Sequence, residues 1–135
     1  MRTRGLMAAI VMAGALTLAC NSTFGVEDAV GTWDTTSVNG VSLPGVFWLY
    51  LASGDSTVVD AQALWFEFDA APTCSYTQQL TGQAPVQFDD CTYSVAAGGD
   101  VSVTVSGGSV LSGTANGSAM LLVDDIGNLY SLRKR

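Results

Sequence analysis

Histidine is absent from this chain of 135 residues, and basic residues are scarce. The chain holds five lysines and arginines against twelve aspartates and glutamates, and none of the basic residues lies between Cys20 and Leu132. Without histidine there are no serine–histidine triads and no histidine bases, and most zinc sites are excluded. Nucleic-acid binding needs cations that neutralise phosphates, so its absence is expected as well. We therefore predict no enzyme, no metal, no cofactor and no nucleic-acid partner.

A long apolar span is also lacking. The uncharged run Leu6–Ala19 follows Arg2 and Arg4, and it is shorter than the about 20 residues that a membrane-spanning helix needs. A basic start, a short apolar core and a small residue at its end are typical of a secretory signal. The pattern predicts a leader over residues 1–19. Its removal takes two basic residues away and changes the formal net charge from −7 to −9.

The end of the leader carries a second signal. Leu16–Cys20 resembles the lipobox of bacterial lipoproteins, in which cleavage occurs before a lipidated cysteine. Ala19 is typical of that box, whereas Thr17 stands where leucine is usual. The resemblance implies that Cys20 is a lipid anchor on an exported protein; an ordinary signal peptide with an incidental cysteine is the alternative. Asn21 is not the aspartate that retains some lipoproteins in the inner membrane, which favours the periplasmic face of the outer membrane.

Three cysteines are present. If lipid occupies Cys20, then Cys74 and Cys91 remain as a pair. An exported chain meets an oxidising compartment in many bacteria, and such a pair tends to close there. The sequence predicts a Cys74–Cys91 disulfide, with two buried free thiols as the alternative.

After a tether over residues 20–29, the chain predicts one domain over residues 30–135. Short runs rich in β-branched and aromatic residues alternate with turn signals such as Asn39-Gly40, and no sustained helical stripe is present. We expect strands at 30–37, 46–52, 57–59, 63–69, 73–80, 87–95, 101–106, 109–115, 118–123 and 129–133. Tight turns favour antiparallel neighbours, and closure removes exposed edges. The pattern predicts an all-β fold, a small antiparallel up-and-down barrel of eight to ten strands.

Three segments carry a resemblance to a family. Gly31-Thr32-Trp33 resembles the Gly-x-Trp signature of lipocalins. The segment 37–40 (SVNG) with Leu43-Pro44, and the closing segment 129–133 (LYSLR), resemble the small lipocalin-like domains of bacterial lipoproteins. A second resemblance is to the META-type domain of heat-shock-induced lipoproteins, which shares a first strand led by tryptophan. The lipocalin resemblance implies a lipocalin-like barrel in which Trp33 closes one end and Arg133 packs across it by a cation–π contact.

Five aromatic residues are candidates for lining a ligand site. They are Trp48, Tyr50, Trp65, Phe66 and Phe68. Core packing is the competing interpretation, but barrel mouths commonly hold apolar ligands. Trp65 is the best candidate because it has the opposite strand parity to Phe66 and Phe68. We expect a monomer that binds a small apolar molecule; the alternative is a structural or protein-interaction module whose core is filled with side chains.

Two groups of acidic residues admit a chemical interpretation. Glu67 and Asp69 share one strand face, either as a working carboxylate pair or as a solvated surface. Asp124, Asp125 and Asn128 could supply oxygens to calcium, or they could serve as turn residues that bond their own backbone. We favour the solvated surface and the turn.

Overall fold

The computed structural model describes residues 24–135, so the predicted leader and the proposed anchor at Cys20 lie outside the described residues. Strands dominate, as the sequence predicts. In chain order the elements are α2 (Val26–Ala29), β1 (Gly31–Val38), β2 (Val41–Ser42), β3 (Gly45–Tyr50), β4 (Ser56–Phe68), β5 (Thr73–Leu80), β6 (Val86–Ala96), β7 (Asp100–Thr104), η1 (Ser106–Gly108), β8 (Val110–Asn116), β9 (Ala119–Asp124) and β10 (Leu129–Lys134).

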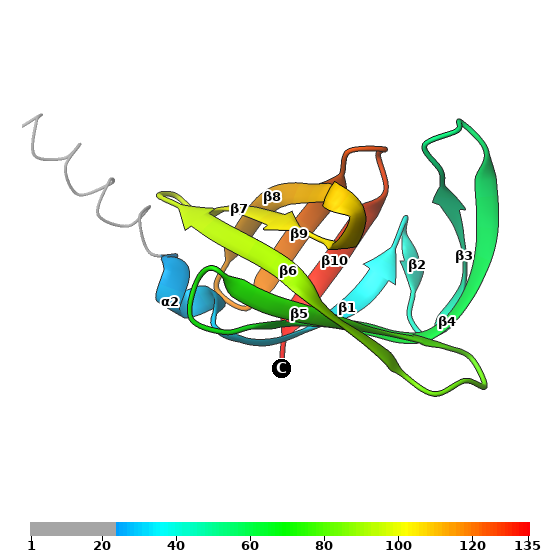
Figure 1. The fold of residues 1–135 in the computed structure, drawn as a ribbon, viewed down its shortest axis with the longest axis horizontal. Helices are drawn as coiled ribbons and strands as arrows, with labels where there is room; N and C mark the ends of the chain where they lie inside the picture. Colours follow the sequence, from blue (N-terminus) through cyan, green and yellow to red (C-terminus); the bar gives the residue numbers. More distant parts are fainter. Residues whose placement is uncertain (1–23) are drawn as a thin grey trace, which may run out of the picture.

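Eight of the strands close into an antiparallel barrel (Figure 1). The order around the wall is β1-β10-β9-β8-β7-β6-β5-β4, and β4 returns to pair with β1. The closing pairs join residues 31–34 to residues 65–68. The short β2 extends the sheet beyond β1, and β3 extends it beyond β4. The prediction of a small antiparallel barrel of eight to ten strands is confirmed.

The strand β4 pairs with different neighbours along its length. The sequence suggests two strands here, at 57–59 and 63–69, but one continuous strand is present. Its register against β5 shifts between Ala61 and Ala63, which places an extra residue in β4 as a β-bulge. Before the bulge β4 pairs with β3, and near its end it pairs with β1. The hairpin over residues 45–61 therefore leaves the closed wall. We call it the arm; it stands at the opposite end of the molecule from α2 (Figure 1).

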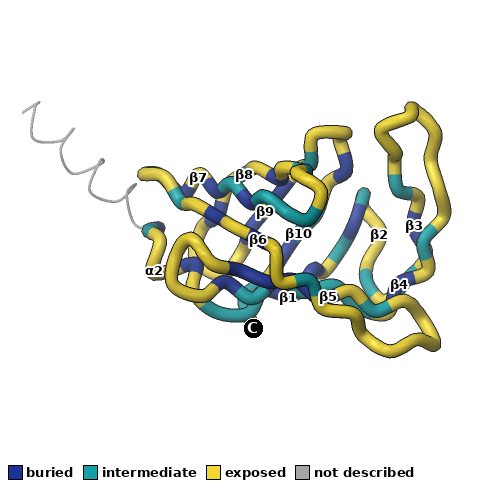
Figure 2. The backbone as a smooth tube through the Cα atoms, viewed as in Figure 1, coloured by how far each residue is buried: buried dark blue, intermediate teal, exposed yellow. Residues whose placement is uncertain are grey.

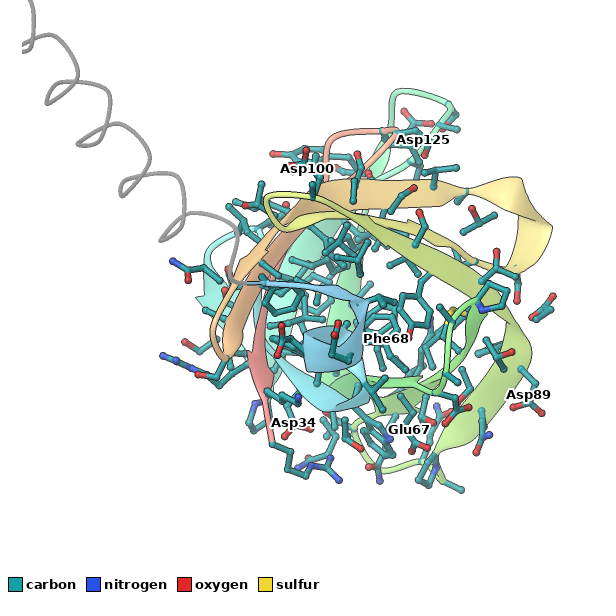
Figure 3. All side chains as sticks on the ribbon, turned by 90° about the vertical axis from the view of Figure 1, so that its left-hand side faces the viewer. Asp34, Glu67, Phe68, Asp89, Asp100 and Asp125 are labelled. Carbon is teal, nitrogen blue, oxygen red and sulfur yellow. A yellow bond between two sulfur atoms is a disulfide. The ribbon has the colours of Figure 1, made fainter. Side chains whose placement is uncertain are left out.

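Aromatic side chains fill the end of the barrel near α2. Trp33 is fully buried, and the ring centroid of Phe68 lies 4.7 Å from that of Tyr93 and 6.0 Å from that of Phe66. Phe68 lies inside the ring of strands, whereas Glu67 lies toward its outside (Figure 3). Buried residues are concentrated in this half of the barrel, whereas the residues of the arm are mostly exposed (Figure 2). The barrel is thus packed at one end.

The segment before β1 belongs to the packed domain. The sequence predicts a tether over residues 20–29, but Phe24 and Ala29 are buried against the barrel. The single turn α2 brings these two apolar residues to the same place, where the Trp33 ring nitrogen donates a 2.8 Å hydrogen bond to the carbonyl of Ala29. The Phe24 ring meets Trp33 edge-on at 6.4 Å. The packed domain therefore begins by Phe24 and not at residue 30.

The Cys74–Cys91 disulfide is present, as predicted. The two cysteines stand directly opposite each other on β5 and β6, and both are buried. They belong to the same apolar cluster as Trp33 and Phe68. The bridge therefore fastens the filled half of the barrel.

Candidate functional site

An apolar cavity of about 230 Å³ opens where the arm leaves the barrel wall. We call it the mouth pocket. Its walls come from the β2–β3 connection, β3, β4, β5 and β10. Most of the lining residues are apolar: Leu43, Phe47, Leu49, Val59, Ala61, Ala63, Leu64 and Leu80, with Gln78, Gln79 and Tyr130 as the polar members.

A smaller cavity of about 120 Å³ lies deeper in the barrel. It shares Leu64, Gln78 and Tyr130 with the mouth pocket, so the two cavities are adjacent and together run inward along the barrel. Phe66 and Tyr76 line the deeper cavity, and beyond them lies the aromatic packing of the filled end. The interior of the barrel is therefore hollow toward the arm and filled with aromatic side chains toward α2, where a separate hollow of about 260 Å³ is lined by Phe24, Asp28, Asn116, Gly117 and Lys134.

Small side chains create the space. Ala61 and Ala63, on either side of the bulge in β4, both line the mouth pocket. Regular alternation without a bulge would also place these two residues on one face of the strand, with Gln62 on the other. What the bulge adds is Leu64, which follows Ala63 directly and still lines both cavities. Two methyl groups at this bend leave room that larger side chains would occupy.

Strand parity decides which aromatic residues of β3 face the cavity. Phe47 and Leu49 line the mouth pocket. Trp48 and Tyr50 point the other way, with 59% and 52% of their surface exposed. These two predicted lining residues therefore lie outside the cavity: the run VFWLYLA is apolar on both faces, so its pattern could not show which face turns inward. With Val46 and Val58 they form an exposed apolar surface, the outer patch.

The three predicted lining residues of β4 have three different environments. Trp65 is half-buried on the outside of the barrel, where its ring nitrogen donates to Glu67 at 3.3 Å and the guanidinium of Arg135 lies 5.8 Å from its ring centroid. Phe68 is packed in the filled end. Only Phe66 borders a cavity, the deeper one.

The cation over Trp33 is Lys134 and not the predicted Arg133. The Lys134 ammonium lies 5.9 Å from the ring centroid. In the β1–β10 register Trp33 stands opposite Lys134, and directly opposed residues point to the same face of a sheet. Arg133 stands opposite Asp34 and turns the other way, donating to the hydroxyl of Ser118 at 3.3 Å. The predicted partner was displaced by one residue, which reverses its side.

Two asparagines hold the arm over the mouth pocket. The side-chain oxygen of Asn128 accepts hydrogen bonds from the backbone nitrogen of Tyr50 at 2.8 Å and from the amide of Asn39 at 2.9 Å. The Asn128 amide donates to the Tyr50 carbonyl at 2.9 Å, and the Asn39 amide donates to the Trp48 carbonyl at 2.8 Å. We call this pair the amide clamp. It joins the edge of β3 to the β1–β2 turn and the β9–β10 loop.

A carboxylate shapes the β9–β10 loop. One oxygen of Asp124 accepts hydrogen bonds from the backbone nitrogens of Ile126, Gly127 and Asn128 at 2.8–3.0 Å. Burial alone would raise the pKa of Asp124, but these bonds and the one from the Asn128 side chain outweigh it and hold the pKa below its usual value. Asp124 thus acts as a turn residue, as favoured from the sequence.

Tyr130 connects this loop to the cavities. It lines both cavities, and its hydroxyl donates to the second oxygen of Asp124 at 3.2 Å. Burial raises the pKa of Tyr130 well above its usual value, and the charge of Asp124 adds to the effect. The phenol therefore stays neutral and keeps a lone pair that can accept a further hydrogen bond.

The positive charges of the described chain lie at one end of the molecule. The basic residues of the described chain are Arg133, Lys134 and Arg135, and they lie near α2: Lys134 donates to the carbonyl of Asp28 at 2.8 Å, and Arg135 pairs with Asp34 at 2.6 Å. None of the described residues that line the mouth pocket carries a positive charge. Within residues 24–135, no three histidine, cysteine or acidic side chains gather as a metal site. The same residues include no helix long and apolar enough to cross a bilayer.

No family model matches the chain, and searches of the curated proteins and of the solved structures likewise found no match. The fold and the site therefore rest on the chain's own residues. Sequence reasoning missed the amide clamp and Tyr130. Asn39 and Asn128 were visible only as turn residues, because the contact that joins them crosses 89 residues.

Proposed function

We propose that this chain is a cell-envelope lipoprotein whose barrel binds a small apolar molecule. The observation that carries the proposal is the mouth pocket, about 230 Å³ of mostly apolar cavity at the end of the barrel that faces the arm. Ligand sites are concave, largely apolar and furnished with a few polar groups. The mouth pocket has these properties, with Gln78, Gln79 and Tyr130 as its polar groups.

The cavity is placed where a ligand can enter. The arm is bound at its edge by the amide clamp and not by a full strand ladder, so fewer bonds oppose its opening than oppose separation of the closed wall. Its residues are also more exposed than those of the filled end (Figure 2). Segments with few buried contacts open most readily. We infer that ligand enters between the arm and β10.

Anchorage at Cys20 is the second part of the proposal. The leader pattern supports it, and so does the pairing of Cys74 with Cys91, which leaves Cys20 as the remaining cysteine. Three residues separate Cys20 from Phe24, which packs near α2. Because the arm lies at the other end (Figure 1), the mouth pocket of an anchored molecule would open away from its own membrane, which we propose is the outer membrane. The mass of the N-terminal peptide of the mature protein tests the lipid directly.

Binding can be tested with N-phenyl-1-naphthylamine, an uncharged probe that fluoresces in apolar surroundings. The folded domain should raise its fluorescence saturably. Ala63→Phe should fill the mouth pocket and weaken binding at least tenfold. Val58→Phe adds the same side chain on the exposed face of β4 and should bind as the parent does. Circular dichroism must show that both variants are folded.

Two results would overturn ligand binding. One is a parent protein that gives no saturable signal. The other is an Ala63→Phe variant that is folded and binds as tightly as the parent, because the probe would then sit elsewhere, such as on the outer patch.

The outer patch supports a second candidate function, interaction with another protein. Val46, Trp48, Tyr50 and Val58 are each at least half exposed on one face of the arm. Tryptophan and tyrosine are enriched at interface hot spots. A photo-crosslinking residue at position 48 should then yield one defined adduct in producing cells, whereas the same residue at exposed Gln87 should not. Equal labelling at both positions would remove this candidate.

A further inference from the structure

We infer that the ligand is a slender single-chain amphiphile with an uncharged, hydrogen-bond-donating head, such as a long-chain alcohol, and not a fatty-acid anion. This inference rests on the proposed binding function and names its ligand class. Three features of the described structure carry it: the shape of the cavities, the position of the charges, and the hydrogen-bonding state of Tyr130.

The shape favours a chain. The mouth pocket and the deeper cavity are each small, about 230 and 120 Å³, and they adjoin each other, with Leu64, Gln78 and Tyr130 lining both. A rigid four-ring system such as a sterol would need a single chamber larger than either cavity. A flexible chain can occupy the mouth and extend inward until it meets Phe66 and Tyr76, which begin the aromatic packing.

The charges disfavour an anion. The cations of the described chain lie near α2, and the residues around the mouth pocket include none. A negative charge already contacts one lining residue: Asp124 accepts the hydrogen bond of the Tyr130 hydroxyl, and its lowered pKa keeps it ionised. A carboxylate head would enter without a counter-ion and beside a like charge. Burying an unpaired charge is strongly unfavourable, so an acid would have to bind in its protonated form.

Hydrogen bonding favours a donor. The Tyr130 hydroxyl gives its proton to Asp124, so its oxygen can only accept a further bond. One N–H of the Gln79 amide is also committed, because it donates to the carbonyl of Gln83 at 3.1 Å. An alcohol can donate to the Tyr130 oxygen, whereas a carboxylate offers acceptors alone. The site therefore complements a head that carries O–H or N–H.

Displacement of N-phenyl-1-naphthylamine by decan-1-ol and by decanoate tests the inference with matched chains. At pH 7 decanol should displace the probe at least tenfold more effectively than decanoate. The difference in displacement between decanol and decanoate should narrow at about pH 4, where a carboxylic acid is partly neutral. Gln79→Lys would supply a cation at the mouth pocket; at pH 7 it should raise the affinity for decanoate relative to decanol at least fivefold over the ratio measured for Gln79→Met. Gln79→Met is its uncharged control and should not favour decanoate.

The outcomes separate the two levels of the proposal. If the probe binds but decanoate equals or exceeds decanol at pH 7, the ligand class is wrong while apolar binding stands. If Gln79→Lys binds decanoate no more tightly than Gln79→Met does, the charge argument is also contradicted. If the parent binds neither the probe nor either chain, the proposed function itself fails.

Discussion

The side chain of Asn128 pairs with the backbone of Tyr50 as a neighbouring strand would. Its oxygen accepts from the Tyr50 nitrogen at 2.8 Å, and its nitrogen donates to the Tyr50 carbonyl at 2.9 Å, although the two residues are 78 positions apart. The strand β3 is otherwise an edge, paired only with β4. An exposed edge promotes pairing with other chains. One amide here both covers part of that edge and fastens the arm.

Asn128→Ala should show how much the clamp contributes. Asn128 is 1% exposed, and its loss leaves the backbone nitrogen and carbonyl of Tyr50 without the partner that they have in the clamp. Each unsatisfied buried group costs about 1–3 kcal/mol, so the free energy of unfolding should fall by at least about 2 kcal/mol. Urea unfolding measures it. Asn116→Ala, on an exposed asparagine of β8, should change it by about 0.5 kcal/mol or less. Equal effects of the two substitutions would contradict the role of the clamp.

Asp124 should make stability depend on acid. Its folded-state pKa is lowered, so its contribution is present above the unfolded-state pKa, near 4, and is lost as the pH falls through the lower folded-state value. The free energy of unfolding of Asp124→Asn should therefore lie below that of the parent at pH 7, and the gap should shrink below about pH 4. Urea unfolding at pH 7 and pH 2.5 measures both. A gap that grows on acidification would show that the sign is wrong.

The disulfide should contribute measurably to stability. A bridge across a sequence separation of 17 restricts the unfolded chain by about 3 kcal/mol in the chain-entropy estimate. Replacing both cysteines by alanine should lower the free energy of unfolding by roughly this amount. Dithiothreitol should destabilise the parent but leave the double variant unchanged. Destabilisation of the variant by the reductant would point to another redox-sensitive group.

Thr35→Val should be neutral or stabilising. Thr35 is 5% exposed, and within the described residues its hydroxyl is the buried side-chain group that has no hydrogen-bond partner. Valine has nearly the same shape and removes the unsatisfied oxygen, which costs about 1–3 kcal/mol when buried. Thermal and urea unfolding of the variant should match or exceed those of the parent. Thr77→Val, at another buried threonine, is the comparison. A clear loss of stability only in Thr35→Val would show that its hydroxyl has a partner.

The fold could be predicted because its signals are local. Turn residues and alternating strands such as Val101 and Val103 gave the strand count and the antiparallel order, and the cysteine count gave the disulfide. The bulge between Ala61 and Ala63 could not be predicted from the sequence. Ala63 and Leu64 are consecutive apolar residues, so the pattern there shows no interrupted alternation that would mark an extra residue.

The site was harder to predict because it depends on parity and on distant contacts. A shift of one residue turned Lys134, and not Arg133, toward Trp33. The same kind of ambiguity in β3 assigned Trp48 to the cavity in place of Phe47. Hydrophobicity identifies the runs, but only the register across strands decides their sides.

The divided strand β4 also has an evolutionary consequence. Closure of the barrel depends on residues 65–68, whereas the cavity wall contributed by the arm lies before the bulge. Substitutions in residues 56–61 can therefore alter the wall of the mouth pocket without disturbing the pairs that complete the fold. Such a chain separates the part that selection must conserve from the part that can diversify, so related proteins with this barrel should differ most along the arm. For protein engineering, the same boundary marks the arm as the segment to exchange when a new specificity is sought.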